Sequence, residues 1–104
     1  MNGDIFKGEW RNDHVNGKGI LRYANGNMYE GDWLDDKRHG FGTYHNAQDG
    51  SRYEGTWANN RRDGEGKLVL ASGHIVIGNW KEGRINGPVE FRLAPDSYWA
   101  NPEV

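Results

Sequence analysis

Residues 29–44 read Tyr-Glu-Gly-Asp-Trp-Leu-Asp-Asp-Lys-Arg-His-Gly-Phe-Gly-Thr-Tyr, and the main features of this stretch recur along the whole chain. Tryptophans stand at positions 10, 33, 57 and 80, at intervals of 23, 24 and 23 residues, each two residues after a glycine. A Gly-x-Gly element begins seven residues after each tryptophan, degenerate in the last copy, where residues 87–89 read Gly-Pro-Val. A fixed period of this length indicates a repeat architecture. We expect the 104 residues to form one array, with repeats at about 6–28, 29–52, 53–75 and 76–96 and a tail at 97–104.

Side chains within each repeat alternate as β-strands require. Tyr29, Gly31 and Trp33 share one face of a strand, while Glu30 and Asp32 lie on the other. Asn-Gly at 16–17, 25–26 and 86–87 and Asp-Gly at 49–50 and 63–64 predict turns. No segment combines a 3.6-residue period with helix caps. The sequence therefore predicts an all-β, single-layer antiparallel meander, a rod of roughly 38 Å if eight strands are spaced by about 4.8 Å.

Glycines at fixed strand positions need a physical reason, because glycine weakens a strand. The expected reason is volume. A tryptophan of one strand would lie across the bare backbone of the neighbouring Gly-x-Gly strand and bury its ring without a second layer.

These residues resemble the MORN repeat, the "membrane occupation and recognition nexus" motif. The resemblance covers about residues 2–93 and is weakest in the fourth repeat, where Val76 replaces the tyrosine. It implies a strand-only array and a role in scaffolds of cilia, the cytoskeleton or cell junctions, or in an accessory segment of an enzyme such as a lipid kinase or lysine methyltransferase. It also implies docking of an extended or amphipathic helical segment of a protein partner, or self-association. Affinity for phospholipid is proposed for the family and is not general to it.

Both ends of the sequence carry expectations. Residues 2–6 match residues 25–29 in register, so the chain opens at a turn and is expected to be a fragment of a longer protein. At the other end, residues 97–104 are expected to cap the array, with Trp99 in the place that Tyr29 and Tyr53 hold in their repeats.

Composition argues against several classes of function. A net charge of −2 does not favour nucleic-acid binding. The chain has no cysteine, and its four histidines are scattered, so we expect no metal, no cofactor and no catalytic site. The Gly-x-Gly elements lack the third glycine of a dinucleotide-binding loop, which is replaced by Arg22, His45 and Val69. With no membrane span and no signal peptide visible, a cytoplasmic location is expected, possible sites being the cytoskeleton or a cilium.

A row of cations follows the tryptophans and is expected to form a ridge along one edge of the array. Its members, which would be the candidates for contact with anionic lipid, are Lys37, Arg38, Arg61, Arg62 and Arg84. Interleaved acids such as Asp36, Asp63 and Glu82 are expected to neutralise it, so lipid binding should be weak.

The aromatic face is the predicted binding surface, because one layer of strands cannot cover its own apolar side chains. The predicted partner-binding residues are Trp10, Tyr23, Trp33, Tyr44, Trp57, Leu68, Trp80 and Phe91. The sequence thus predicts a non-catalytic protein-binding scaffold module. The alternatives are a phosphoinositide-binding membrane module and a regulatory segment of an enzyme whose catalytic domain lies outside this chain.

Overall fold

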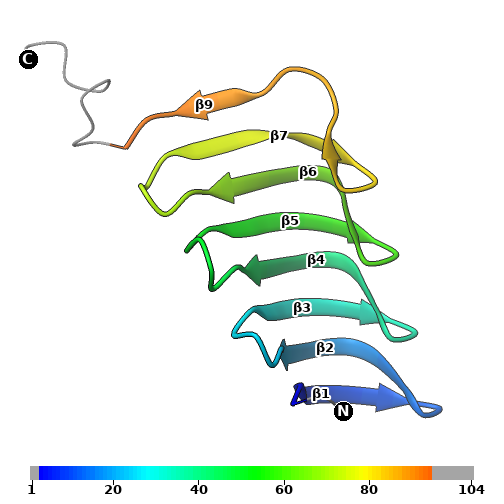
Figure 1. Ribbon diagram of the computed structural model, residues 1–104. Helices are drawn as coiled ribbons and strands as arrows, with labels where there is room; N and C mark the ends of the chain where they lie inside the picture. Colours follow the sequence, from blue (N-terminus) through cyan, green and yellow to red (C-terminus); the bar gives the residue numbers. More distant parts are fainter. Residues whose placement is uncertain (1–2, 95–104) are drawn as a thin grey trace, which may run out of the picture.

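Nine antiparallel strands form one open sheet in the computed structural model, which describes residues 3–94 (Figure 1). The strands are β1 (Ile5–Arg11), β2 (His14–Arg22), β3 (Met28–Leu34), β4 (Lys37–His45), β5 (Arg52–Ala58), β6 (Arg61–Val69), β7 (Ile75–Lys81), β8 (Arg84–Ile85) and β9 (Glu90–Arg92). Each strand pairs with the next one in the sequence from β1 to β8, and β9 also pairs with β7. The predicted single-layer, elongated meander is confirmed.

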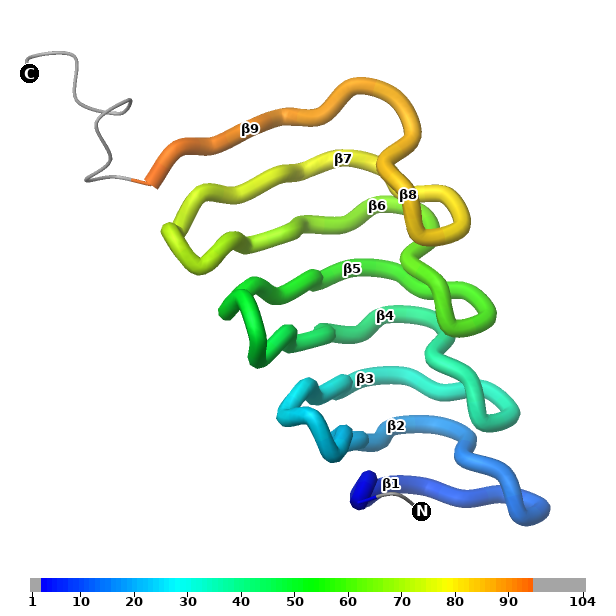
Figure 2. The backbone as a smooth tube through the Cα atoms, viewed as in Figure 1, coloured from blue at the N-terminus to red at the C-terminus, as the bar shows by residue number. Residues whose placement is uncertain are grey.

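Two rows of turns run along the long edges of the sheet (Figure 2). On the edge next to the tryptophans, each turn has two central residues, both with positive φ, for example Asp35 (47°) and Asp36 (68°). This geometry is that of type I′ hairpins, which match the twist of the strands they join. The equivalent turns are residues 12–13, 59–60 and 82–83.

Two predicted turns are wrong, because residues 16–17 lie inside β2 and residues 63–64 lie inside β6. Residues 86–87 lie in the connection between β8 and β9, with a bend at Gly87. The positive φ of Gly17 and Gly64 serves irregular strand pairing instead. Gly31 pairs with Gly42, and Trp33 pairs with Arg38. Between these two pairs the chain advances by two residues in β3 but by four in β4. Gly40, with φ of 83°, absorbs the surplus.

The packing over the glycines agrees with the prediction in part: the tryptophans pack against a neighbouring Gly-x-Gly strand, but the nearest rings over Gly42 and Gly66 are tyrosines. The ring that lies over Gly42 belongs to Tyr29, and the ring over Gly66 belongs to Tyr53. The tryptophans pack against the preceding Gly-x-Gly strand: Trp57 Nε1 donates a hydrogen bond of 3.1 Å to the carbonyl of Gly42. Tyr29 meets Trp33 and Trp57 edge to face, at ring-centroid distances of 5.1 and 5.4 Å. Interlocked rings therefore bury one another without a second layer.

The fourth repeat is irregular. Its second strand is broken into β8 and β9 around Pro88, a residue that cannot donate to a ladder. Val89 stands where the other repeats have the second glycine, next to Gly78. The predicted cap at 97–104, with Trp99, lies outside the described residues.

Candidate partner-binding site

The two faces of the sheet differ in chemistry. On the face opposite the tryptophans, charged side chains pair with one another: Glu54 accepts from Arg52 at 2.5 Å and lies 3.5 Å from Lys67, and Lys18 pairs with Asp32. Asp32 also accepts a hydrogen bond of 3.1 Å from the backbone N–H of Phe41. This face is mainly charged, although Phe41 is 57% exposed on it. Some of its carboxylates secure the irregular strand pairing, which the sequence did not indicate.

The aromatic face offers less surface than the sequence predicted. Of the predicted partner-binding residues, Trp33, Trp57 and Trp80 are buried, at 8%, 7% and 3% exposed. Trp10 occupies the equivalent site but is 61% exposed, because no strand is paired on the outer side of β1 in the described residues. The three inner tryptophans therefore expose little of their own surface, and other side chains form most of the accessible part of this face.

The accessible part of this face is formed by side chains at the ends of the Gly-x-Gly strands. Tyr23, Tyr44 and Leu68 are half-buried and pack against the aromatic core, and Phe91 is exposed. The rings of Tyr23 and Tyr44 lie 5.8 Å apart, so these two residues form one continuous surface.

Arg38 and Arg62 also lie on the aromatic face, although the sequence predicted them in the ridge at the edge. Arg38 is paired with Trp33 across the strands, and its guanidinium carbon lies 4.9 Å from the ring centroid of Trp57 and 5.3 Å from that of Tyr44. The guanidinium carbon of Arg62 lies 5.6 Å from the ring centroid of Tyr53. These distances are typical of cation–π interactions, which hold both charges over the aromatic core.

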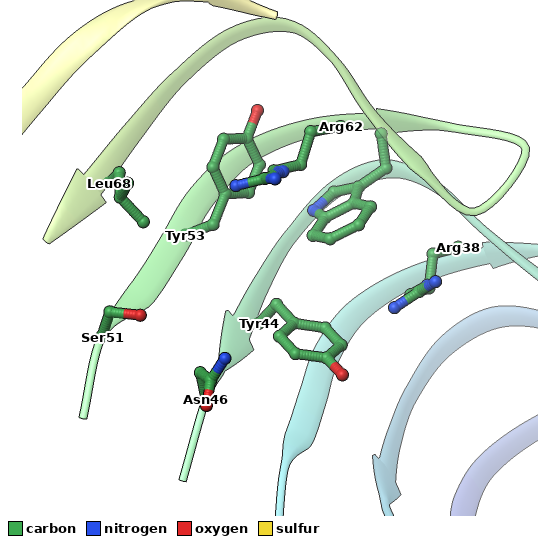
Figure 3. A pocket seen from close by; sticks show the side chains of 8 residues that line it. Arg38, Tyr44, Asn46, Ser51, Tyr53, Arg62 and Leu68 are labelled. Carbon is green, nitrogen blue, oxygen red and sulfur yellow. The ribbon is translucent and has the colours of Figure 1, made fainter. Parts of the chain in front are cut away.

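A hollow of about 240 Å³ lies between the two arginines at the centre of the sheet (Figure 3). Tyr44, Trp57 and Leu68 supply its apolar wall, and Asn46 and Ser51 supply polar atoms near the turn between β4 and β5. Figure 3 shows Arg62 at the top of this group of side chains and Arg38 at its right. The arrangement of aromatic rings beside guanidinium groups is one that protein interfaces favour.

The electrostatics of the hollow are positive. Burial raises the pKa of the Tyr53 hydroxyl to about 12, so this residue stays neutral and donates a hydrogen bond of 3.1 Å to the carbonyl of Thr56. Within residues 3–94, no carboxylate forms a salt bridge with Arg38 or Arg62. The hollow therefore has the charge to receive an acidic group.

The remaining ridge contains Lys37, Arg61 and Arg84, each at the start of a strand. Arg61 lies 3.8 Å from Glu82. The first repeat has His14 at the same position, and its ring nitrogen lies 2.6 Å from Asp36. Acids of the next turn thus pair with part of the ridge, as the sequence suggested.

Among the described residues, no three histidine, aspartate or glutamate side chains are grouped to hold a metal ion. Between residues 3 and 94 there is no helix of the length and apolar character needed to cross a membrane.

Sequence reasoning missed the arginines of the hollow, yet a signal was present. Asp35 and Asp36 tolerate positive φ, so a two-residue turn at this point pairs Leu34 with Lys37 and Trp33 with Arg38. Counting outward from that turn places Arg38 on the tryptophan face. Asn46 and Ser51 come together only through the turn between β4 and β5, for which the sequence offers no comparable rule.

Comparison with known proteins supports the fold and leaves the partner open. The chain matches no curated protein sequence. The model of the MORN repeat matches residues 6–28, 29–51, 53–75 and 77–88, which together cover most of the chain. With four matched repeats and the meander that they form, the chain belongs to the MORN-repeat family.

Proposed function

We propose that this chain is a protein-binding scaffold module that holds a segment of a partner against its aromatic face. MORN repeats in general are interaction or membrane-associated modules of a non-catalytic type. The finer assignment, to a protein partner at this face, rests on the hollow between Arg38 and Arg62.

The hollow supports the proposal because it joins three properties in one place. Tyr44 and Leu68 leave apolar surface uncovered, Trp57 forms a rigid floor, and two guanidinium groups border the space. Interface hot spots are enriched in tyrosine, tryptophan and arginine, which combine a large contact area with hydrogen-bond donors. On the opposite face, Lys18 pairs with Asp32, and Glu54 pairs with Arg52 and Lys67.

A displayed library of random peptides tests the proposal. Peptides selected on residues 1–104 should bind in competition with one another and should fail to bind a Tyr44→Ala variant. Thr43→Ala is the matched control, since Thr43 is adjacent in β4 and lies on the opposite face. Selected peptides that bind both variants equally would exclude the aromatic face.

A photoreactive group placed in a selected peptide gives an independent readout. Crosslinks should map to β4, β5 and β6 on the side of Tyr44 and Leu68. Crosslinks confined to the ridge residues Lys37, Arg61 and Arg84 would instead indicate recognition of an acidic ligand by charge alone, and would favour the phosphoinositide alternative.

A further inference from the structure

The two arginines of the aromatic face occupy equivalent positions one repeat apart. Arg38 pairs with Trp33 and Arg62 pairs with Trp57 across the strands. The same position holds Val15 in the first repeat and Ile85 in the fourth. Positive charge on this face is therefore concentrated in the second and third repeats, with an apolar residue at each flank.

Backbone groups of the next turn hold each guanidinium in place. Arg38 donates from Nη2 to the carbonyl of Asn60 at 2.9 Å, and Arg62 donates from Nη2 to the carbonyl of Gly83 at 3.1 Å. An arginine has five N–H donors, so these contacts leave donors on each side chain available to a ligand. A cation fixed in this way loses little side-chain entropy when it pairs with a carboxylate.

The spacing of the two charges matches the distance between residues i and i+7 of an α-helix. Two strands separate equivalent residues of adjacent repeats, a distance of about 9.6 Å along the array. Seven residues of an α-helix rise by about 10.5 Å and return to nearly the same face. An extended strand covers about 10 Å in three residues, but residues i and i+3 point to opposite faces. A helix can therefore present two carboxylates from one face to both arginines, whereas a β-strand at this spacing cannot.

We propose that the partner segment is an acidic amphipathic helix that lies along the array, across the strands, with Asp or Glu at positions i and i+7 paired with Arg38 and Arg62. Apolar side chains between the two acids fill the hollow at Tyr44 and Leu68, and an apolar residue one heptad beyond the acid at Arg62 contacts Ile85, which is 50% exposed. This inference rests on the proposed function of the aromatic face. Charge complementarity with two arginines that have no carboxylate partner among residues 3–94 is what selects this partner.

Two labelled helical peptides of identical composition test the register. One has glutamates seven residues apart on its apolar face, and the other has them five residues apart, on different sides of the helix. Fluorescence anisotropy with residues 1–104 should give an affinity about tenfold higher for the seven-residue spacing, equivalent to about 1.4 kcal/mol. Equal affinities would overturn the inference.

Variants of the chain assign the difference to the two arginines. Arg38→Gln and Arg62→Gln should each remove most of the preference for the seven-residue spacing. Arg61→Gln, one residue away on the ridge, should leave it within about twofold. A preference that survives both substitutions at Arg38 and Arg62 would also overturn the inference.

The substitution at Arg38 removes contacts within the chain, so the peptide provides a second route. Replacing either glutamate of the seven-residue peptide by glutamine should lower its affinity for the unchanged chain about fivefold or more. If neither replacement lowers the affinity, the proposed pairing is contradicted, whatever the stability of the arginine variants.

Two further measurements separate this inference from the proposed function. Suppose that the unchanged chain binds both peptides with equal affinity and that Tyr44→Ala weakens the binding of both. The aromatic face then binds the peptides, and the proposed spacing of the acids is wrong. If Tyr44→Ala changes neither affinity, the proposed function fails as well. Vesicles that contain phosphoinositide should not displace the peptide at physiological salt, and displacement would favour a lipid headgroup as the ligand of these arginines.

Discussion

The ring of Tyr29 lies directly over the backbone of Gly42 on the facing strand, so closely that a Cβ at Gly42 would overlap the ring. Tyr53 and Gly66 repeat this relationship one repeat further along. The Tyr29 hydroxyl then donates a hydrogen bond of 2.8 Å to the carbonyl of Asp32. Glycine would otherwise weaken the strand, but here its lack of a side chain makes room for a buried ring.

The fourth repeat shows the same site with both partners changed. Val76 replaces the tyrosine and Val89 replaces the glycine, so a large and a small side chain become two of intermediate size. Val89 is 42% exposed and its side chain lies against Gly78, so this site is less buried than that of Tyr29 and Gly42.

Gly42→Val should destabilise the array by about 2–4 kcal/mol, because the new side chain would displace the ring of Tyr29 from its site. The free energy of unfolding, measured by urea denaturation, checks this value. An unchanged transition would show that the ring does not need the bare backbone.

Tyr29→Val provides the background for a double-mutant cycle at the same pair. In that background Gly42→Val should cost less than about 1 kcal/mol, since the space left by the Tyr29 ring can accept the new side chain. Equal costs of Gly42→Val in both backgrounds would mean that Tyr29 and Gly42 are not coupled.

Asn60 holds the turn between β5 and β6, with φ of 70°, and its side-chain oxygen accepts a hydrogen bond of 2.9 Å from the backbone N–H of Arg38. Asn60→Gly should cost about 1 kcal/mol, for the lost hydrogen bond. Asn60→Ala should cost about 1–2 kcal/mol more, because alanine resists the left-handed region. Thermal melts of the two variants measure the difference, and coincident melts would remove backbone strain as a factor.

The order and pairing of the strands could be predicted from the sequence, while the turns were predicted less well. The spacing of Trp33 and Gly42 reports the register directly, because both positions are under a packing constraint. An Asn-Gly or Asp-Gly pair reports only that positive φ is tolerated, and both turns and irregular strand pairing use it. Asn16-Gly17 and Asp63-Gly64 therefore lie in strands, and the turns fall on the Asx pairs at 35–36 and 59–60.

The location of the aromatic surface was predictable, but its accessible part was not. Trp57 and Tyr44 belong to the same face by parity, yet one is buried and the other is half-buried. The difference arises because Tyr29 and Tyr53 flank Trp57 edge to face, which depends on ring orientation in three dimensions. Nothing in the local sequence encodes that orientation.

The contact between His14 and Asp36, which connects the first two repeats, should make the stability of the array depend on pH. The hydrogen bond and the charge of Asp36 raise the pKa of His14 above 6.5, and the same contact helps to lower the pKa of Asp36 below 3.8. The contribution of His14 to stability is full below pH 6.5 and is lost as pH rises through its folded pKa. The contribution of Asp36 is full above pH 3.8 and is lost as pH falls through its folded pKa.

Asp36→Asn tests this coupling, since asparagine can still accept from the backbone N–H of Val15. The pKa of His14, measured by NMR titration, should fall towards its ordinary value in the variant. The difference in melting temperature between the two proteins should be greatest between about pH 4 and pH 6.5. A His14 pKa that is the same in both proteins would show that the pair does not form.

Vesicles that contain phosphoinositide should bind the chain weakly at physiological salt. Part of the ridge is paired, through Arg61 with Glu82, and each effective basic residue adds only about 1 kcal/mol near an anionic surface. Vesicle cosedimentation measures the affinity. Submicromolar binding that is lost in a Lys37→Glu, Arg61→Glu variant would contradict the expectation.

The affinity of one library-selected peptide for two sets of variants tests the assignment of the binding face most directly. Tyr44→Ala should weaken binding by about 1–3 kcal/mol and leave the circular-dichroism spectrum unchanged, because Tyr44 borders the hollow and is only half-buried. Charge reversal at Glu30 and Glu54, on the opposite face, should change the affinity by less than about 0.5 kcal/mol. Binding that follows the charge reversals and ignores Tyr44 would show that the partner docks on the other face of the sheet.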